Sequence, residues 1–287
     1  MNKIIYALFL VIALVFVSCS TKPKVKEDVY NLRSFAERGL DSANKEIAQG
    51  NYVSAISLLS EYKRMAILSD DPSLITRVCL SYGNALFYFG KTDDAFAQWD
   101  QAEKEAKRAD NAELVSVSRI FRAKGNLMSE RLGAQAVLDE ADRESAGIKK
   151  DVFFVAYTWQ VKGLALRSLK RYKEAEDAIK QSLAIHVKQK SLENVSFDWY
   201  TIASIRSLAG NSGEALQALE KSIEADRRIE NSWGLAASYR AMGDVYRKMG
   251  DEEKALAAYE RAKIIYTALK NNNEAGKIEE RIEGQIK

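Results

Sequence analysis

Apolar residues recur three and four positions apart along most of the chain, with polar residues between them. That spacing places the apolar side chains on one face of an α-helix. Strict alternation of apolar and polar residues, which would indicate strands, is rare. The 287 residues include only 2 Pro and 15 Gly, so few positions would interrupt long helices. The pattern therefore predicts an all-α fold.

Small and large residues also return at fixed places within these helices. In residues 236–262, Gly243 is followed by Gly250, Ala255, Tyr259 and Ala262. Earlier copies of this pattern are Trp199, Ala203, Gly210, Ala215, Leu219 and Ser222; Trp159, Gly163, Ala175, Ile179 and Ser182; Cys79, Gly83, Gly90, Ala95, Trp99 and Ala102; and Ala43, Gly50, Ala55 and Leu59. A weaker copy contains Phe121, Gly125, Val137 and Ala141. The copies start near residues 36, 76, 118, 156, 196 and 236, so the period is close to 40.

This spacing resembles the tetratricopeptide repeat (TPR), which has a small residue at position 8, Ala at 20 and large residues at 4 and 24. The resemblance implies two antiparallel helices per repeat, held close together by the small residues. It implies that residues 31–271 form an α-solenoid of about six helix-turn-helix repeats with a concave inner face. Because the standard repeat is shorter, at about 34 residues, we expect the extra residues to lengthen the second helix of each pair.

The last segment, residues 272–287, resembles a further first helix in which most positions have become polar. It keeps Ile278 and Ile282 for one face. A terminal cap of a repeat array needs one apolar face and one polar face. We therefore expect a C-terminal capping helix.

The chain begins with one lysine, Lys3, and an uninterrupted apolar run from Ile4 to Val17. This run of 14 residues is shorter than the roughly 20 residues that a membrane-spanning helix needs. It fits the apolar region of a secretory signal peptide. The run leads into the sequence FVSC, which is followed by the polar stretch STKPKVKED.

FVSC resembles a bacterial lipobox, with Phe16 at the place usually held by Leu. The resemblance implies cleavage before Cys19 and attachment of acyl chains such as palmitate to that cysteine. Residues 1–18 would then be a lipoprotein signal peptide and residues 19–30 a polar tether. We expect the protein in the cell envelope, anchored to the inner or outer membrane and facing the periplasm. An uncleaved signal anchor and a soluble secreted protein are the alternatives.

The charged and reactive residues narrow the range of functions. Forty-three basic and 40 acidic residues are interspersed and give a net charge of +3, which does not favour nucleic-acid binding. One His and two Cys are too few for a His/Cys metal site. No nucleophile–base pair or phosphate loop is visible, so we predict neither an enzyme nor a cofactor. His186 lies in the helical run QSLAIHVKQK, and we expect it on a helix surface rather than in a catalytic triad.

In the TPR family, residues at positions 2, 5, 9, 12 and 13 of the first helix line the concave groove. The resemblance therefore implies a mixed groove that contacts protein partners through Arg77, Asn84, Tyr88, Arg119, Arg122, Asn126, Tyr157, Gln160, Tyr200, Arg240, Asp244 and Arg247. Asn44 shares position 9 with Asn84. The alternative is that these residues form ordinary solvated helix faces. The carboxylate clamp of one TPR subclass is not expected, because Leu80 and Ala123 stand where it needs Lys and Asn.

The tryptophans divide into two groups. Trp99, Trp159 and Trp199 fall on structural positions of the repeat, so we predict that they belong to the core. Trp233 falls in a turn between repeats, and a ligand contact stays open for it.

The sequence favours a lipid-anchored scaffold that holds envelope or periplasmic proteins through the concave groove. A second hypothesis is a TPR accessory subunit of a TRAP-type transporter, which would bind a ligand or the periplasmic binding protein. A third is a surface adhesin.

Overall fold

The computed structural model describes residues 31–286. The signal peptide, Cys19 and the polar tether predicted for residues 1–30 lie outside the described residues. The residues from Leu32 onward form one compact unit.

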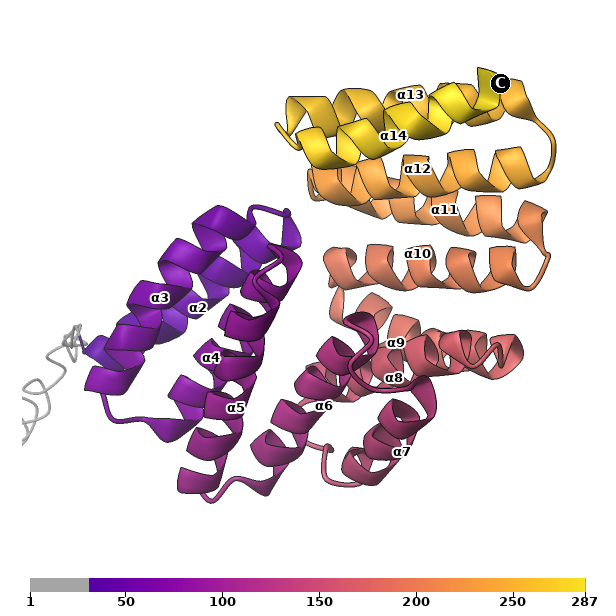
Figure 1. The fold of residues 1–287 in the computed structure, drawn as a ribbon. Helices are drawn as coiled ribbons and strands as arrows, with labels where there is room; N and C mark the ends of the chain where they lie inside the picture. The colour runs from indigo at the N-terminus through magenta and orange to yellow at the C-terminus, as the bar shows by residue number, and fades with distance from the viewer. Residues whose placement is uncertain (1–30, 287) are drawn as a thin grey trace, which may run out of the picture. The chain divides into compact units, whose positions relative to one another are not determined.

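The described residues form thirteen α-helices and no strand, stacked in the order of the sequence (Figure 1). They are α2 (Leu32–Ala48), α3 (Tyr52–Leu68), α4 (Pro72–Tyr88), α5 (Thr92–Arg108), α6 (Ala112–Met128), α7 (Ala134–Ser145), α8 (Val152–Ser168), α9 (Tyr172–Gln189), α10 (Leu192–Leu208), α11 (Ser212–Arg228), α12 (Ser232–Lys248), α13 (Glu252–Ala268) and α14 (Asn272–Ile286). The predicted all-α solenoid with about six helix pairs and a C-terminal helix is confirmed. No helix between residues 31 and 286 is both long and apolar enough to cross a membrane.

The turns between helices recur with a regular period. A residue with positive φ follows nearly every helix, at Gly50, Asp70, Gly90, Asp110, Glu130, Lys170, Lys190, Gly210, Glu230, Gly250 and Lys270. At the end of α4, the Gly90 N–H donates to the Phe87 carbonyl (3.0 Å) and the Lys91 N–H donates to the Leu86 carbonyl (2.8 Å). This pair of bonds is a Schellman motif, which satisfies the last carbonyls of a helix. Most helices have 17 residues and most turns have three, and this regularity produces the period of the sequence.

The residues that make each repeat longer than a standard TPR do not lie where we expected them, in the second helix of the pair. Both helices of a typical pair have 17 residues, as in α4 and α5, so the second helix is not the longer one. Most first helices begin four residues before the start inferred from the sequence; α4, for example, begins at Pro72. The early start follows from the turn signals, since the Asp71 side chain caps α4 by accepting from the Leu74 N–H (3.0 Å).

The third repeat departs from this period. Its first helix, α6, begins in phase with α4, but the turn that follows runs over residues 129–133 and is two residues longer than the corresponding turn after α4. The second helix, α7, is therefore displaced by two residues and is only 12 residues long. This displacement explains why the third copy is weak in the sequence.

Small residues at position 8 allow the two helices of a pair to touch. A β-carbon at Gly83 would collide with the Trp99 ring, and one at Gly163 would collide with Ile179. In the last pair, a β-carbon at Gly243 would lie 2.5 Å from the Tyr259 ring. These contacts confirm the close approach that the resemblance implied.

The C-terminal helix α14 covers the end of the stack. Ile278 is fully buried, and Ile282 packs against the same cluster as Tyr259 and Tyr266. The remaining surface of α14 is largely polar, which is what a terminal cap requires.

Candidate ligand-binding cavity

The first helices of the repeats enclose a cavity of about 760 Å³. Helices α2, α4, α6, α8, α10 and α12 all contribute side chains to its wall. The second helices contribute only Tyr52 from α3, and Ser222 and Asp226 from α11. The cavity therefore lies along the face that the TPR resemblance assigns to the groove.

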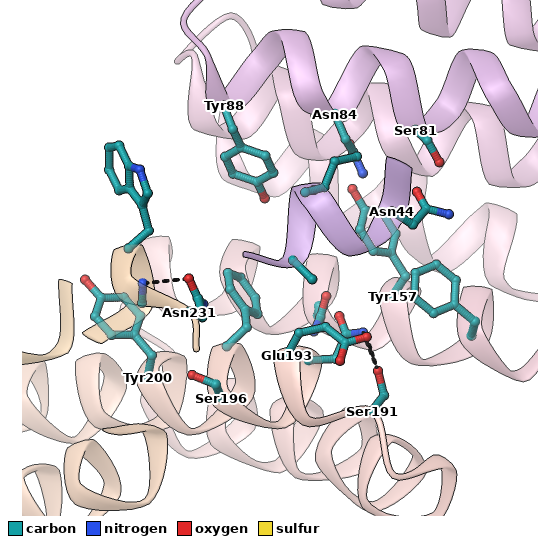
Figure 2. Close-up of a pocket in the computed structure, with 18 of the residues that line it drawn as sticks. Asn44, Ser81, Asn84, Tyr88, Tyr157, Ser191, Glu193, Ser196, Tyr200 and Asn231 are labelled. Atoms are coloured by element: carbon teal, nitrogen blue, oxygen red, sulfur yellow. Dashed lines mark hydrogen bonds between the residues drawn. The ribbon is translucent and has the colours of Figure 1, made fainter. Parts of the chain in front are cut away.

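Residues one repeat apart occupy equivalent places in the wall. Asn44, Asn84 and Lys124 follow one another at the repeat period and supply position 9 of the first three repeats. Position 5 of the last three repeats supplies Gln160, Tyr200 and Arg240. Figure 2 shows Asn44 and Asn84 on one side of the cavity and Tyr200 on the other. Position 9 faces the cavity in the first three repeats and position 5 in the last three, because each repeat is rotated relative to the one before it.

Trp233 brings the last helix pair against the first one. It lies in the first turn of α12, which Asn231 caps by accepting from the Gly234 N–H (3.0 Å). The indole is 6.1 Å from the ring centroid of Tyr52, and a β-carbon at Gly50 would lie 2.5 Å from its Cδ1 atom. The two ends of the repeat array therefore meet beside the cavity, and Trp233 forms part of the wall.

Lys124 is the most deeply buried cation of the wall, with 6% of its surface exposed. Its Nζ atom lies 4.7 Å from the ring centroid of Tyr157, 5.0 Å from that of Phe197 and 5.8 Å from that of Tyr88. Burial opposes the charged form, but the two tyrosines favour it, and the net effect holds the pKa of Lys124 above its ordinary value. Lys124 is therefore charged at neutral pH.

Tyr157 places a hydrogen-bond donor beside this ammonium. Its ring stacks on Phe121 with 4.2 Å between centroids, and the whole side chain is buried. Burial raises the pKa of Tyr157 above its ordinary value, so the hydroxyl keeps its proton. The hydroxyl lies near Lys124 and Asn84, but no described residue completes a hydrogen bond with it. It can donate to a molecule that enters the cavity.

The wall near α11 and α12 is polar and includes a carboxyl. Asp226 is fully buried, and its Oδ1 atom accepts from the Asn231 amide (2.8 Å). Its Oδ2 atom has no partner within residues 31–286. Burial raises the pKa of Asp226 to about 6. Beside it, the hydroxyls of Ser196, Ser222 and Ser238 form a chain with distances of 3.0 and 3.1 Å.

The cavity brings together part of the predicted groove, namely Arg77, Asn84, Tyr88, Tyr157, Gln160, Tyr200 and Arg240. The predicted residues that do not line it are Arg119, Arg122, Asn126, Asp244 and Arg247. The wall also contains residues outside the predicted set, and Lys124, Phe121, Phe197, Asp226 and Trp233 are among them.

Arg119 and Arg122 hold neighbouring helices together instead of facing the cavity. Arg119 forms ion pairs with Glu103 of α5 (3.1 Å) and Glu144 of α7 (3.0 Å). Arg122 pairs with Asp100 of α5 (3.1 Å). Arg119 and Arg122 therefore lie outside the cavity wall, and a partner contact through them stays a prediction.

Asp244 and Arg247 also have partners in the stack. Asp244 accepts from the Tyr259 hydroxyl (2.6 Å) and pairs with Arg281 of the capping helix (3.3 Å). Arg247 lies over the Tyr259 ring, 5.4 Å from its centroid. Asp244 therefore joins α12 to α13 and to the cap, and Arg247 packs on α13 within the same repeat.

The register predicted for the third repeat was wrong for a single reason. Gly125 resembled the small residue of position 8, which set the start of the copy at 118 and placed Asn126 at position 9. A strict period of 40 from Gly83 points to Ala123 instead and puts Lys124 at position 9. The displaced second helix α7 supported the wrong register, because Val137 and Ala141 follow the longer turn. Counting forward from the clear second repeat would have found Lys124.

His186 is not on a helix surface, contrary to the expectation. It is 1% exposed, and its Nδ1 atom lies 2.7 Å from Asp198 Oδ2 and 3.2 Å from the Ser182 hydroxyl. Gln160 donates to the other oxygen of Asp198 (2.8 Å). Serine and aspartate thus approach the same ring nitrogen, whereas a catalytic triad places them on opposite nitrogens. The cluster joins neighbouring helices of the stack.

The predicted core tryptophans pack into the stack. Trp99 is 2% exposed, and Trp159 and Trp199 are partly buried against the same core. Cys79 is buried in α4, and burial raises the pKa of its thiol to about 11, which keeps it protonated. Among residues 31–286, no three His, Cys, Asp or Glu side chains converge as a metal site.

Two stretches of the chain match family models described as tetratricopeptide repeat, at residues 156–185 and 196–268. The chain therefore contains tetratricopeptide repeats, and the helix geometry continues through the N-terminal pairs. No curated protein sequence matches the chain.

Solved structures share the fold at low sequence identity. A Rap protein complexed with competence and sporulation factor is 14% identical, with a TM-score of 0.59 over 85% of this chain and 72% of that one. Aspartyl phosphate phosphatase F from Bacillus subtilis is 14% identical, with a TM-score of 0.51 over 87% of this chain and 69% of that one. A signal transduction ATPase from Pyrococcus horikoshii with a tetratricopeptide repeat sensor is 13% identical, with a TM-score of 0.52 over 87% of this chain and 42% of that one. These likenesses concern the fold alone.

Proposed function

We propose that the protein mediates protein–protein interaction by holding a peptide segment of its partner in the cavity. The observation that carries the proposal is the placement of Asn44 and Asn84 at equivalent positions of successive repeats, both in the wall. A side-chain amide offers one acceptor and two donors, which match the backbone groups of an extended peptide. Tyr88, Tyr157 and Tyr200 add aromatic surface, which often supplies the anchors of an interface.

Binding of peptides would test this proposal directly. A random hexapeptide library is incubated with the chain from residue 31 onward, and retained peptides are identified by mass spectrometry after ultrafiltration. Asn44→Ala combined with Asn84→Ala should reduce retention, whereas Asn126→Ala serves as the control because Asn126 lies outside the wall. Retention unchanged in the double variant would exclude the two amides as peptide-binding groups.

We propose further that Cys19 carries acyl chains that anchor the protein to the envelope membrane, facing the periplasm. The support is the apolar run that ends at FVSC and the polar residues that follow it. Several acyl chains give stable anchoring where one chain would not. Radiolabelled palmitate should be incorporated into the wild type and not into Cys19→Ala. Equal labelling of the two would contradict anchoring at Cys19.

A role beside a periplasmic binding protein is the second candidate. It is favoured by the size of the cavity, since about 760 Å³ falls in the range of small-molecule sites. Crosslinking in intact cells would distinguish the two roles. A binding protein of a transporter as the main crosslinked partner would support the second candidate, and other envelope proteins would support the scaffold.

A further inference from the structure

We propose that Lys124 receives a carboxylate of the ligand, between the rings of Tyr157 and Phe197. The proposal rests on the cavity being the binding site, as proposed above, and adds the chemistry of the group that binds there. It assigns a role to a residue that lies outside the groove predicted from the sequence.

Lys124 differs from the other cations of the wall in its lack of a carboxylate partner among the described residues. Arg240 pairs with Glu274 (2.8 Å), and Arg77 lies 3.9 Å from Asp151. Lys124 forms no ion pair with any carboxylate of the described residues, although it is the most buried of these cations. The groups that stabilise its charge are the side chains of Tyr88 and Tyr157 and the ring of Phe197.

A buried ammonium group is usually paired with a carboxylate or another anion. A lysine with a purely structural role would be expected to reach a carboxylate or the solvent, as Lys162 does by pairing with Asp142 (2.8 Å) while lying 5.1 Å from the Trp159 ring centroid. An anionic group in the cavity would complete the same arrangement at Lys124.

A second observation supports an acceptor at this place. The buried hydroxyl of Tyr157 completes no hydrogen bond among residues 31–286, and the Tyr157 ring is the one nearest to Lys124 Nζ. One ammonium and one phenolic O–H can bind the two oxygens of a single carboxylate, in a charge-assisted arrangement.

The remaining wall favours a monoanion over a phosphate dianion. Asp41, Asp151 and Glu193 also line the cavity, so a second negative charge on the ligand would meet carboxylates. The Phe197 ring lies 5.0 Å from the ammonium, and Phe121, which stacks on Tyr157, adds apolar surface to the same wall. The site therefore fits a carboxylate attached to an apolar body.

Lys124→Met separates binding from folding. Methionine has a similar length, and replacing a buried unpaired charge by an apolar group tends to preserve or raise stability. The matched control is Lys162→Met, which removes a lysine that also lies over an aromatic ring but outside the wall.

The experiment compares ligand libraries that differ only in the carboxylate. Wild type, Lys124→Met and Lys162→Met are each incubated with a random hexapeptide library lacking Asp and Glu, in free-acid and in C-terminally amidated form. A third arm uses a set of aliphatic and aromatic monocarboxylic acids beside their primary amides. Retained compounds are quantified by mass spectrometry, and thermal unfolding confirms that each variant is folded.

We expect the wild type and Lys162→Met to retain free acids over amides by roughly tenfold or more, and Lys124→Met to lose this preference. If free acids are preferred over amides among the peptides, the ligand group is a C-terminal carboxylate. If free acids are preferred only among the monocarboxylic acids of the third arm, the ligand is a small organic acid and the peptide is excluded. Equal retention of acids and amides by the wild type overturns the carboxylate proposal while peptide binding stands. Retention of nothing in any arm overturns both proposals, and an unchanged preference in Lys124→Met overturns the assignment to this residue.

Discussion

The indole of Trp233 occupies the space in which a side chain at residue 50 would stand. Gly50 belongs to the first turn of the array and Trp233 to its sixth helix pair, so this contact joins residues far apart in the sequence. Trp233 also lines the cavity, as does Tyr52, which lies two residues after Gly50 and 6.1 Å from the indole, so the contact lies at the cavity wall.

Gly50→Ala should therefore destabilise the protein more than Gly250→Ala. The two glycines have nearly equal φ values, +77° and +78°, so each substitution should cost about 1–2 kcal/mol for the left-handed conformation. At Gly50 the added carbon also displaces Trp233, which should cost about 1–3 kcal/mol more, whereas nothing lies within 4 Å at Gly250. Urea denaturation measures the difference. Equal costs in the wild type, or a difference that persists in Trp233→Ala, would contradict the contact.

Gly243→Ala tests the packing between the two helices of a repeat. The added carbon would lie 2.5 Å from the Tyr259 ring, so the free energy of unfolding should fall by about 1–3 kcal/mol. Gly276→Ala is the control, since Gly276 lies in the exposed part of α14 with nothing within 4 Å. There, alanine should stabilise the helix by about 0.5–1 kcal/mol. If both substitutions changed the free energy of unfolding in the same direction, helix propensity and not close contact would determine the effect at position 8.

Asp226→Asn should change the pH dependence of stability. The pKa of Asp226 is about 6 in the folded protein against an ordinary value of 3.8, because the carboxyl is buried. Between these pH values the folded chain binds a proton that the unfolded chain has released, so this group lowers the free energy of unfolding as the pH rises from about 4 to about 6. Its contribution is at most roughly 3 kcal/mol.

The measurement is urea denaturation of wild type and Asp226→Asn from pH 4 to pH 7. The stability of the variant relative to the wild type should increase over this window and become constant above it. Carboxylates that pair with arginines elsewhere affect both proteins equally. Parallel curves for the two proteins would mean that Asp226 is ionised in the fold at pH 4.

Asp198→Ala should destabilise the protein by about 3 kcal/mol, because it removes the acceptor of Gln160 and His186 in a buried cluster. Asp100→Ala is the matched control. Asp100 also pairs across repeats, with Arg122, but its side chain is 52% exposed, so the loss should stay below about 1 kcal/mol. Similar losses in chemical denaturation would indicate that the His186 cluster contributes no more than a surface ion pair.

Helix class, repeat number and the contact points between helices could be predicted because they depend on local spacing. The repeat pattern expects a small residue at position 8, which is held by Gly83, Gly163 and Gly243. The structure places a large side chain against each of these glycines. Lys124 was missed because a turn longer by two residues displaces α7 and makes Gly125 look like a marker. One irregular turn was enough to move three of the predicted groove residues off the wall.

Other features could not be obtained from a single repeat. The contact of Trp233 with Gly50 depends on the rotation accumulated over all the pairs between them, and no local pattern encodes that sum. His186 has a polar side chain, yet it is buried because Asp198 of the next helix and Ser182 of its own helix form hydrogen bonds with it. Burial of polar residues through partners from another repeat is invisible to periodicity.

The even spacing of the turns has a consequence for how such a chain can change in evolution. Duplication or loss of one whole repeat would keep every helix in phase with its neighbours, and an open stack would tolerate either event. In this chain the same event would carry Trp233 away from Gly50 by one step of the superhelix. The copy number is therefore tied to the contacts of Trp233 with the first helix pair, and an internal duplication would change the cavity even if each repeat kept its own structure.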